Sequence, residues 1–220
     1  MISSSFHPLE DGYHLGINLG HDRAAAIAAG GRLLVAIEEE RLDRQKHSPG
    51  IERIGGNIQL ELPWNSIRYC LDAVGIDQRE LTSVTANSPG QDFGPQLAAG
   101  RFVDVVVHRL PSHHLAHAYT AWWPSGIQDA LVLVVDATGS TDENDRTESY
   151  SLYRGDTEKL ELIHAEKVEA TLTGVGTLGM LYEEVTRRIG FISHLENGLS
   201  HAEAGKTMGL APYGGESRVF

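Results

Sequence analysis

The sequence is poor in cysteine, in positive charge and in long hydrophobic runs, and each shortage excludes a class of protein. Cys70 is the only cysteine among 220 residues, so no internal disulfide framework can form and a reducing, cytoplasmic location is expected. The net charge of -12 argues against a nucleic-acid-binding surface, which would be basic. No apolar run approaches the ~20 residues of a membrane span, and residues 1–12 lack the pattern of a secretion signal. We therefore expect neither nucleic acid nor membrane as a partner.

The opening of the chain predicts three antiparallel strands. Tyr13–Asn18 and Arg23–Ala29 are apolar runs separated by a turn. The pair Gly30-Gly31 then signals a hairpin into a third strand, Arg32–Ile37. A Rossmann unit would instead cross over through a helix. The sequence therefore favours an α/β fold with an antiparallel beginning.

The rest of the chain alternates between expected helices and strands. The run Glu38–His47 is most simply a solvated, charged helix, whereas Pro63–Gly75 has apolar side chains at helical spacing and a glycine that suits its end. Further elements are expected as follows: strands at 83–86, 101–110 and 131–136, helices at 114–122 and 178–189, a hairpin of 148–153 with 160–164, and a loop at 88–101. Three aromatic side chains are expected in the core: Tyr13, Trp122 and Trp123. The strand–turn–hairpin order near residue 13 returns near residue 131, as in a duplicated domain.

Two histidines and an aspartate form a candidate metal site. His113 and His117 are four residues apart, so on a helix they share one face. A buried strand ends at Asp136, where a carboxylate could complete the ligand set. The alternative is that His113 packs within its helix and Asp136 caps a turn. His114 is left out, because its side chain would point about 100° away on a helix.

Six segments occur in an order that is more specific than any one of them: Leu15–Asp22, Ala36–Arg41 with Lys46-His47, His113–Ala118, Val134–Gly139, Leu178–Glu183 through Gly190-Phe191, and Gly205–Gly214. In this order they resemble the nodulation/cephamycin-type O-carbamoyltransferase family. The resemblance covers most of the chain. It is strongest as a set, since His-x-x-x-His alone is a modest signal.

The resemblance implies a particular architecture. The family's first domain is similar to the tRNA threonylcarbamoyl-transfer enzyme and, more distantly, to the actin/hexokinase/heat-shock-ATPase fold, which has two duplicated α/β lobes. We expect a first lobe at about 1–125 and the start of the second at about 126–220. The family's C-terminal adenylate-forming domain is absent from the sequence, so the resemblance implies that the remainder is a further segment or a second chain.

The resemblance also implies an activity and its cofactors. It predicts transfer of a carbamoyl group from carbamoyl phosphate, through a carbamoyl-adenylate, onto a hydroxyl of a small molecule, with a natural product as the expected acceptor. The implied cofactors are ATP, a divalent metal (iron or zinc) bound by His113, His117 and Asp136, and Mg²⁺ as a further candidate. Two imidazoles and a carboxylate suit iron and zinc alike.

The remaining site residues also follow from the resemblance. His21 would handle the acceptor proton, and Lys46 would face a carbamoyl or phosphate oxygen; the alternatives are a turn histidine and a surface lysine. The implied nucleotide-binding residues are Gly139, Gly179, Glu183, Gly205 and Lys206. The Gly-Lys-Thr at 205–207 is no P-loop, because Ser200 stands where that motif needs glycine.

Two other functions stay open at this point. The chain could be a non-catalytic nucleotide- or metal-binding subunit that works only with a partner chain. It could also be a metal-dependent hydrolase, although the glycine-rich segments would then have no purpose.

Overall fold

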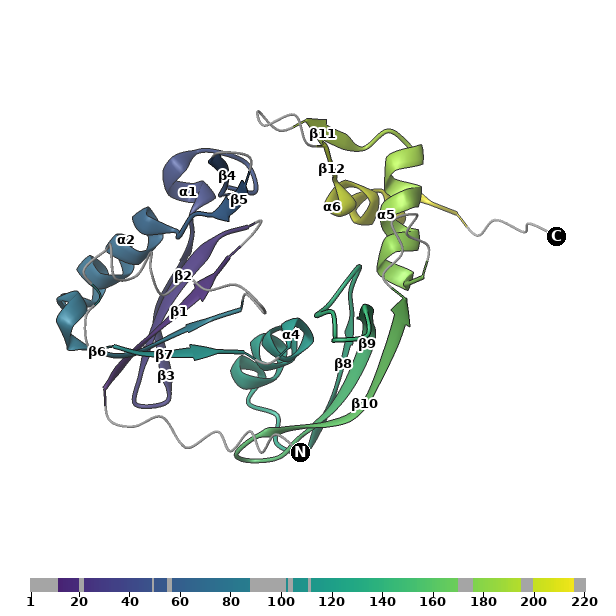
Figure 1. The fold of residues 1–220 in the computed structure, drawn as a ribbon. Coiled ribbons are helices and arrows are strands. Elements are labelled where there is room, and N and C mark those ends of the chain that lie inside the picture. Colours follow the sequence, from purple (N-terminus) through teal and green to yellow (C-terminus); the bar gives the residue numbers. More distant parts are fainter. Residues whose placement is uncertain are drawn as a thin grey trace. The chain divides into compact units, whose positions relative to one another are not determined.

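The computed structural model describes residues 12–19, 22–48, 50–54, 57–87, 102, 105–110, 112–169, 176–194 and 200–215 (Figure 1). The chain forms two compact units, residues 1–116 and 117–220. The boundary falls inside a helix rather than near residue 125, so the expected division into lobes stays a prediction.

The first unit is built on a mixed five-stranded sheet. Its strands are β1 (Tyr13–Asn18), β2 (Ala24–Ala29), β3 (Arg32–Glu38), β6 (Leu81–Ala86) and β7 (Val106–Arg109). Their order is β3-β2-β1-β6-β7. The first three strands are antiparallel, whereas β6 and β7 run parallel to β1. The three-strand opening and the α/β fold class are thus confirmed.

Helix α2 (Trp64–Val74) supplies the other half of the first core. Its Ile67 and Cys70 are buried together with Leu15 and Ile27 of the sheet. Gly75 ends the helix in the left-handed region, as expected. The Cys70 thiol lies 3.4 Å from the Ala25 carbonyl oxygen, and burial raises the pKa of Cys70 to about 11. This thiol is therefore protonated near neutral pH and is no nucleophile.

The charged run after β3 differs from the expected solvated helix. Only Glu40–Asp43 is helical, as α1, and Glu39 is 2% exposed. The Glu39 carboxylate accepts the backbone N–H groups of Asn65 at 3.2 Å and Ser66 at 2.7 Å. It therefore caps the N-terminus of α2, where orphan N–H groups and the helix dipole favour an anion. Composition indicated a solvated surface helix, but the unmet donors of α2 draw Glu39 into the interior.

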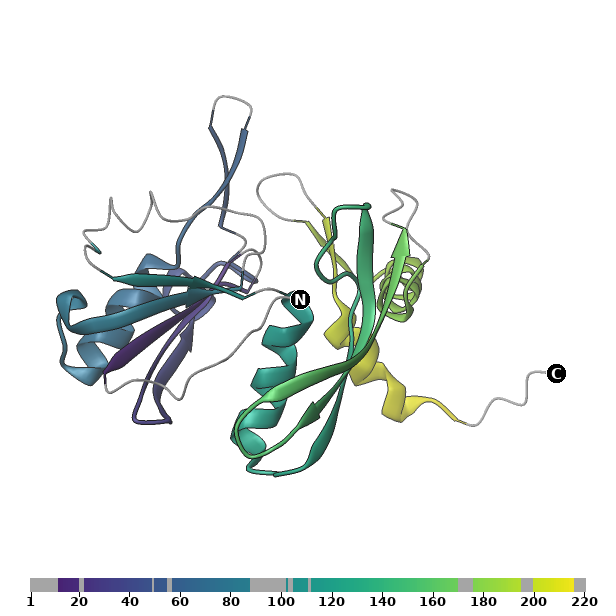
Figure 2. The same ribbon diagram turned by 60° about the horizontal axis from the view of Figure 1, so that its bottom comes forward.

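Several short elements of the first unit were not expected from the sequence. Strands β4 (Ile51–Ile54) and β5 (Asn57–Leu60) form a hairpin, seen as a separate two-stranded ribbon in Figure 2. A 3₁₀ turn, η1 (Gln78–Glu80), follows α2 and is capped by Asp77. The loop expected at 88–101 lies outside the described residues.

The second unit begins with helix α4 (His113–Trp122), most of which belongs to it, and a three-stranded antiparallel sheet. The strands are β8 (Ala130–Val135), β9 (Arg146–Gly155) and β10 (Leu160–Glu169), in the order β10-β9-β8. The Tyr119 hydroxyl lies 3.5 Å from the Leu160 amide, and Trp122 is 6% exposed. Trp123 is 51% exposed, so its expected place in the core was wrong: it lies past the end of α4 in the 3₁₀ turn η2 (Trp123–Ser125).

The unit ends in a small group of helices and strands. These are α5 (Leu178–Arg188), β11 (Ile192–His194), β12 (Ser200–Ala202), α6 (Ala204–Leu210) and the 3₁₀ turn η3 (Ala211–Tyr213). Helix α6 was missed because its glycines lower helix propensity. Contacts such as the 2.8 Å bond between the Thr186 and Thr207 hydroxyls connect it to α5. No helix in the described part of the chain combines the length and apolarity needed to cross a membrane.

The buried cap of α2 gives a first prediction. Glu39→Ala should lower the free energy of unfolding by about 1–3 kcal/mol, because it leaves buried N–H groups without an acceptor. Urea denaturation measures this loss. Glu38→Ala is the matched control, since the neighbouring Glu38 side chain is 51% exposed. Equal losses in the two variants would contradict the capping role.

Candidate metal centre and its surroundings

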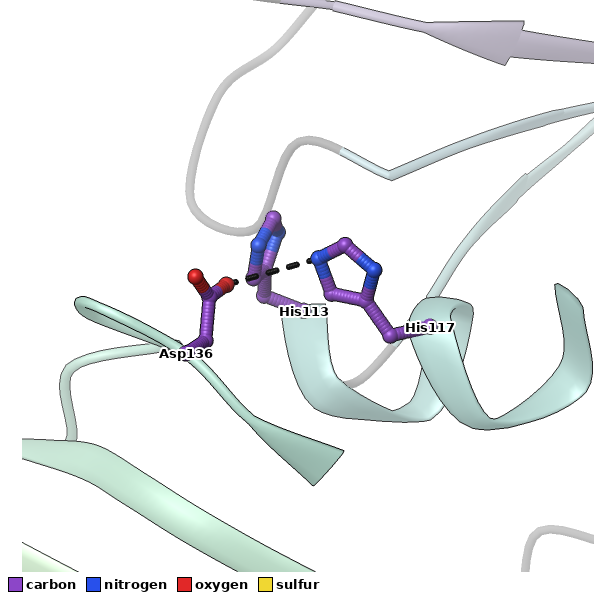
Figure 3. Close-up of side chains that lie close together, drawn as sticks. All are labelled: His113, His117 and Asp136. Atoms are coloured by element: carbon purple, nitrogen blue, oxygen red, sulfur yellow. Dashed lines mark ion pairs between the residues drawn. The ribbon is translucent and has the colours of Figure 1, made fainter. Parts of the chain in front are cut away.

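The structure brings the three predicted metal ligands together. His113 and His117 lie one turn apart on α4, which runs unbroken through the boundary between the units, and Asp136 follows β8. One donor atom of each lies within 4.8 Å of the others. The His117 Nε2 and Asp136 Oδ2 atoms are 3.4 Å apart, as the dashed line in Figure 3 shows. All three side chains in Figure 3 turn toward one another.

The exposure and chemistry of this group fit a divalent cation. The His117 and Asp136 side chains are 53% and 31% exposed, and His113 is half-buried, so an ion could enter. Two imidazole nitrogens and one carboxylate are ligands that iron and zinc accept. His114 is fully buried, which agrees with leaving it out of the ligand set. The ligand assignment itself stays a prediction.

Asp136 also acts in the local turn, as the alternative interpretation expected. Its Oδ1 accepts the N–H of Ala137 at 2.7 Å. Its other oxygen, Oδ2, is the one that faces His117. The two interpretations are therefore compatible, because each uses a different oxygen of the same carboxylate.

The N-terminus of α5 fixes the backbone at Asp136. A Cβ on Gly179 would lie 2.6 Å from the Asp136 carbonyl oxygen and closer still to the Ala137 amide nitrogen. Thr177 caps the helix by accepting the Met180 N–H at 3.0 Å, and its hydroxyl donates to the Ala137 carbonyl at 2.7 Å. Gly179 was predicted for close approach of a nucleotide. Within this unit, the close approach that it permits is that of the peptide following Asp136.

The turn after Asp136 is held against β9. The Gly139 N–H donates to the Glu148 carbonyl at 2.9 Å, and the Thr147 hydroxyl donates to the Gly139 carbonyl at 3.1 Å. Farther along, Asp142 accepts the Arg146 N–H at 3.0 Å and pairs with Lys167 at 3.1 Å. These bonds, the backbone one first, lower the pKa of Asp142. Asp142 of this acidic turn therefore has a structural role, in hydrogen bonds and an ion pair that hold the turn.

The other predicted site residues are distributed over both units. Lys46 lies in an exposed turn after α1, whereas His21 lies outside the described residues. Glu183 pairs with Arg187, with 2.7 Å between Oε1 and Nη2. Gly205 and Lys206 are in the first turn of α6 and are exposed. The nucleotide-binding and catalytic roles of these residues remain predictions.

A second cluster was missed by sequence reasoning. Asp22, Glu40 and His47 also place donor atoms within 4.8 Å of one another. The residues lie in three separate segments, so no spacing rule connects them. The only available signal was that all three fall inside or beside the motifs quoted for the family resemblance.

Comparison with known proteins extends over most of the chain. No family model matches. The chain is 28% identical to nodulation protein NolNO of Sinorhizobium fredii in an alignment of 226 positions, which covers 88% of this chain and 28% of that protein. It is 27% identical to the uncharacterised protein sll1178 of Synechocystis in an alignment of 234 positions, which covers 88% of this chain and 33% of that protein. The chain therefore spans about a third or less of these relatives.

Solved structures also match. YeaZ from Pseudomonas aeruginosa has a TM-score of 0.43 at 12% identity, covering 75% of this chain and 71% of that one. Component A of the (R)-2-hydroxyglutaryl-CoA dehydratase of Acidaminococcus fermentans has a TM-score of 0.44 at 13% identity, covering 80% and 53%.

The ligand set predicts a measurable metal content. Protein purified without chelator should hold about one iron, zinc or similar divalent ion per chain, and His117→Ala should weaken binding by at least about 10-fold, the loss that even an outer-shell partner causes. Elemental analysis measures the occupancy. His164→Ala is the control, because His164 is about as exposed and also faces a carboxylate. Full occupancy in His117→Ala would refute the ligand set.

The packing of α5 gives a second prediction for the same site. Gly179→Ala should destabilise the protein by about 1–3 kcal/mol, as overpacking does, and should lower metal occupancy because the Asp136 backbone must move. Gly209→Ala is the matched control, since a Cβ at Gly209 in α6 meets nothing within 4 Å. Urea denaturation and elemental analysis on the same samples check both effects. Unchanged stability and occupancy in Gly179→Ala would show that the contact is not tight.

Proposed function

We propose that this chain, which resembles the nodulation/cephamycin-type O-carbamoyltransferases, carries the transfer site of such an enzyme. The reaction would move a carbamoyl group from carbamoyl phosphate, through a carbamoyl-adenylate, to a hydroxyl of a small molecule. The observation that carries the proposal is the convergence of His113, His117 and Asp136, the residues that the family resemblance selects. The similarity to NolNO over 88% of the chain supports it.

Transfer of a carbamoyl group to a hydroxyl requires side chains that remove a proton and that stabilise negative charge. The acceptor oxygen attacks the carbamoyl carbon, AMP leaves from that carbon, and the hydroxyl proton must go to a base. In this proposal His21 takes the proton, because an imidazole titrates near neutral pH. Lys46 provides positive charge beside the carbamoyl or phosphate oxygens. A metal held by the three ligands would supply Lewis acidity at the carbonyl or phosphate.

The nucleotide is assigned to the second unit. Glu183 would accept ribose hydroxyls, with Gly139 and Gly179 near the phosphates and with Gly205 and Lys206 beside the nucleotide. Glu183 is already paired with Arg187. The Arg187 and Glu183 side chains are 32% and 38% exposed, so solvent screens the pair and its net contribution to stability is small. Exchanging the guanidinium for ribose should therefore cost little.

A second function would use the same ligand set. His113, His117 and Asp136 would also serve a nucleotide- and metal-binding subunit that gains activity only with a further polypeptide. The third interpretation, a metal-dependent hydrolase, is less favoured because it leaves the proposed nucleotide-binding residues without a role.

One assay separates these functions. The purified chain is incubated with carbamoyl phosphate, ATP and a hydroxylated acceptor, alone and with a separately produced polypeptide covering the rest of NolNO. Carbamate formation by the chain alone supports the complete transfer site, and formation only in the mixture supports the subunit function. His21→Ala should lower the transfer rate by ~10²–10⁴-fold while metal content is retained. Absence of product in both reactions would contradict carbamoyl transfer.

The nucleotide assignment gives its own prediction. Glu183→Ala should weaken ATP binding by about 10-fold or more, which corresponds to ~1–3 kcal/mol for lost hydrogen bonds to a charged group. Glu184→Ala is the matched control, because Glu184 makes the same kind of pair four residues on, with Arg188 at 2.8 Å. Calorimetric titration with ATP measures both affinities. Equal affinities in the two variants would make Glu183 a structural residue.

A further inference from the structure

Two turns of the first unit are tied together through Asp22 and His47. The Asp22 N–H donates to the His47 carbonyl at 2.6 Å. The Asp22 Oδ1 lies 2.8 Å from the His47 Nδ1. Asp22, which follows β1, is thus joined to His47, which follows α1, by one backbone hydrogen bond and one side-chain hydrogen bond. The two residues are 25 positions apart in the sequence.

A second carboxylate, that of Glu40, completes this arrangement. The Glu40 Oε2 accepts the His47 N–H at 2.9 Å, so the amide, carbonyl and ring of His47 are all engaged. On the other side, the Asn18 side-chain amide donates to the Asp22 carbonyl at 2.7 Å. We call Asp22, Glu40 and His47 the turn clamp.

Several residues of these turns have backbone dihedral angles that need support from their surroundings. Asp22, Arg44 and His47 have φ of 54°, 62° and 61°, in the left-handed region that residues other than glycine seldom adopt. Such conformations persist where surrounding contacts over-determine them, and they gather at functional sites. The clamp supplies those contacts at Asp22 and His47.

Hydrogen bonds account for the cluster without a bound ion. The Asp22 carboxylate faces an imidazole nitrogen, and the Glu40 carboxylate accepts a backbone N–H and lies 3.7 Å from Arg41. Each carboxylate therefore already has a positive or hydrogen-bearing neighbour. The clamp is thus better explained as a structural connection than as a second metal site.

The position of the clamp in the sequence connects it to the reaction. His21 directly precedes Asp22, and Lys46 directly precedes His47. Consecutive Cα atoms are 3.8 Å apart, so Lys46 is one peptide unit from a clamped residue. We propose that Asp22 and His47 are positioning residues that hold the turn carrying Lys46 against Asp22, the residue that follows His21 in the sequence. The inference rests on the proposed carbamoyl transfer.

The test uses two substitutions of one residue. His47→Ala removes the ring donor, whereas His47→Asn places an amide nitrogen near the position of Nδ1 and tolerates positive φ. The Asp22 N–H donates to the His47 backbone carbonyl, which the substitution keeps, but loss of the bond between the His47 ring and the Asp22 carboxylate should loosen the turn. Amide hydrogen exchange at Asp22 should therefore accelerate by about tenfold in His47→Ala and should return toward the wild-type rate in His47→Asn. The transfer rate should fall by about 10²-fold in His47→Ala, the order expected for an ångström-scale misplacement, with KM little changed. It should recover largely in His47→Asn.

Two further variants separate positioning from general destabilisation. Asp77→Ala removes an exposed carboxylate that caps a 3₁₀ turn in the same unit, and it should leave both the Asp22 exchange rate and the transfer rate unchanged. Asp22→Ala combined with His47→Ala should be no slower than either single variant, because both break one connection.

The outcomes distinguish the clamp from the reaction. Unchanged exchange at Asp22 in His47→Ala refutes the clamp whatever the activity. Restored exchange without restored transfer in His47→Asn refutes the positioning role. If wild-type protein with the rest of NolNO forms no carbamate, the proposed function fails and the positioning role fails with it, while the exchange rates still decide whether the two turns are connected.

Discussion

A buried guanidinium organises the part of the first unit that surrounds the clamped turns. Arg23 is 6% exposed, and a buried charge is tolerated only when it is paired and hydrogen-bonded. Its side chain donates to the Ser48 carbonyl and hydroxyl, each at 2.9 Å, and lies 3.2 Å from a Glu61 carboxylate oxygen. The chain from α1 to α2 must therefore fold around Arg23. Gly50 lies so close that a Cβ there would be 2.6 Å from the Arg23 Cζ.

This requirement gives the acidic run after β3 its shape. Asp43 lies 3.6 Å from the guanidinium and accepts the Ser48 hydroxyl at 2.5 Å. Glu39 turns inward to cap α2, and Glu40 turns toward His47. A segment that looks like a uniform charged surface thus directs its carboxylates to three different partners. The exposed turn that carries Lys46 is a consequence of these contacts.

In the second unit, contacts with the backbone, rather than a buried charged side chain, hold the candidate site in place. Asp136 stands at the end of β8, and its peptide is held by the close approach of Gly179 and the hydroxyl of Thr177. Alternating side chains on β8 bury Val132 and Val134, while Leu131 and Leu133 are 70% and 62% exposed. The position of Asp136 therefore depends on the buried face of β8 as well as on its contacts with α5. The histidines come from α4, so the geometry of the candidate metal centre depends on all three elements.

The sequence by itself determined the strands β1 to β3, the helices α2, α4 and α5, and the shared face of His113 and His117. These follow from local rules, because the hydrophobic period, the glycine stops and the i, i+4 geometry act within one element. Only the tertiary structure decided that Glu39 is buried, that Gly179 contacts the Asp136 peptide, and that Asp22 meets His47. Each of these contacts joins segments separated by 25 or more residues. Glu39 satisfies N–H groups that become buried only once α2 has packed on the sheet. The other two contacts likewise exist only after packing has brought distant segments together.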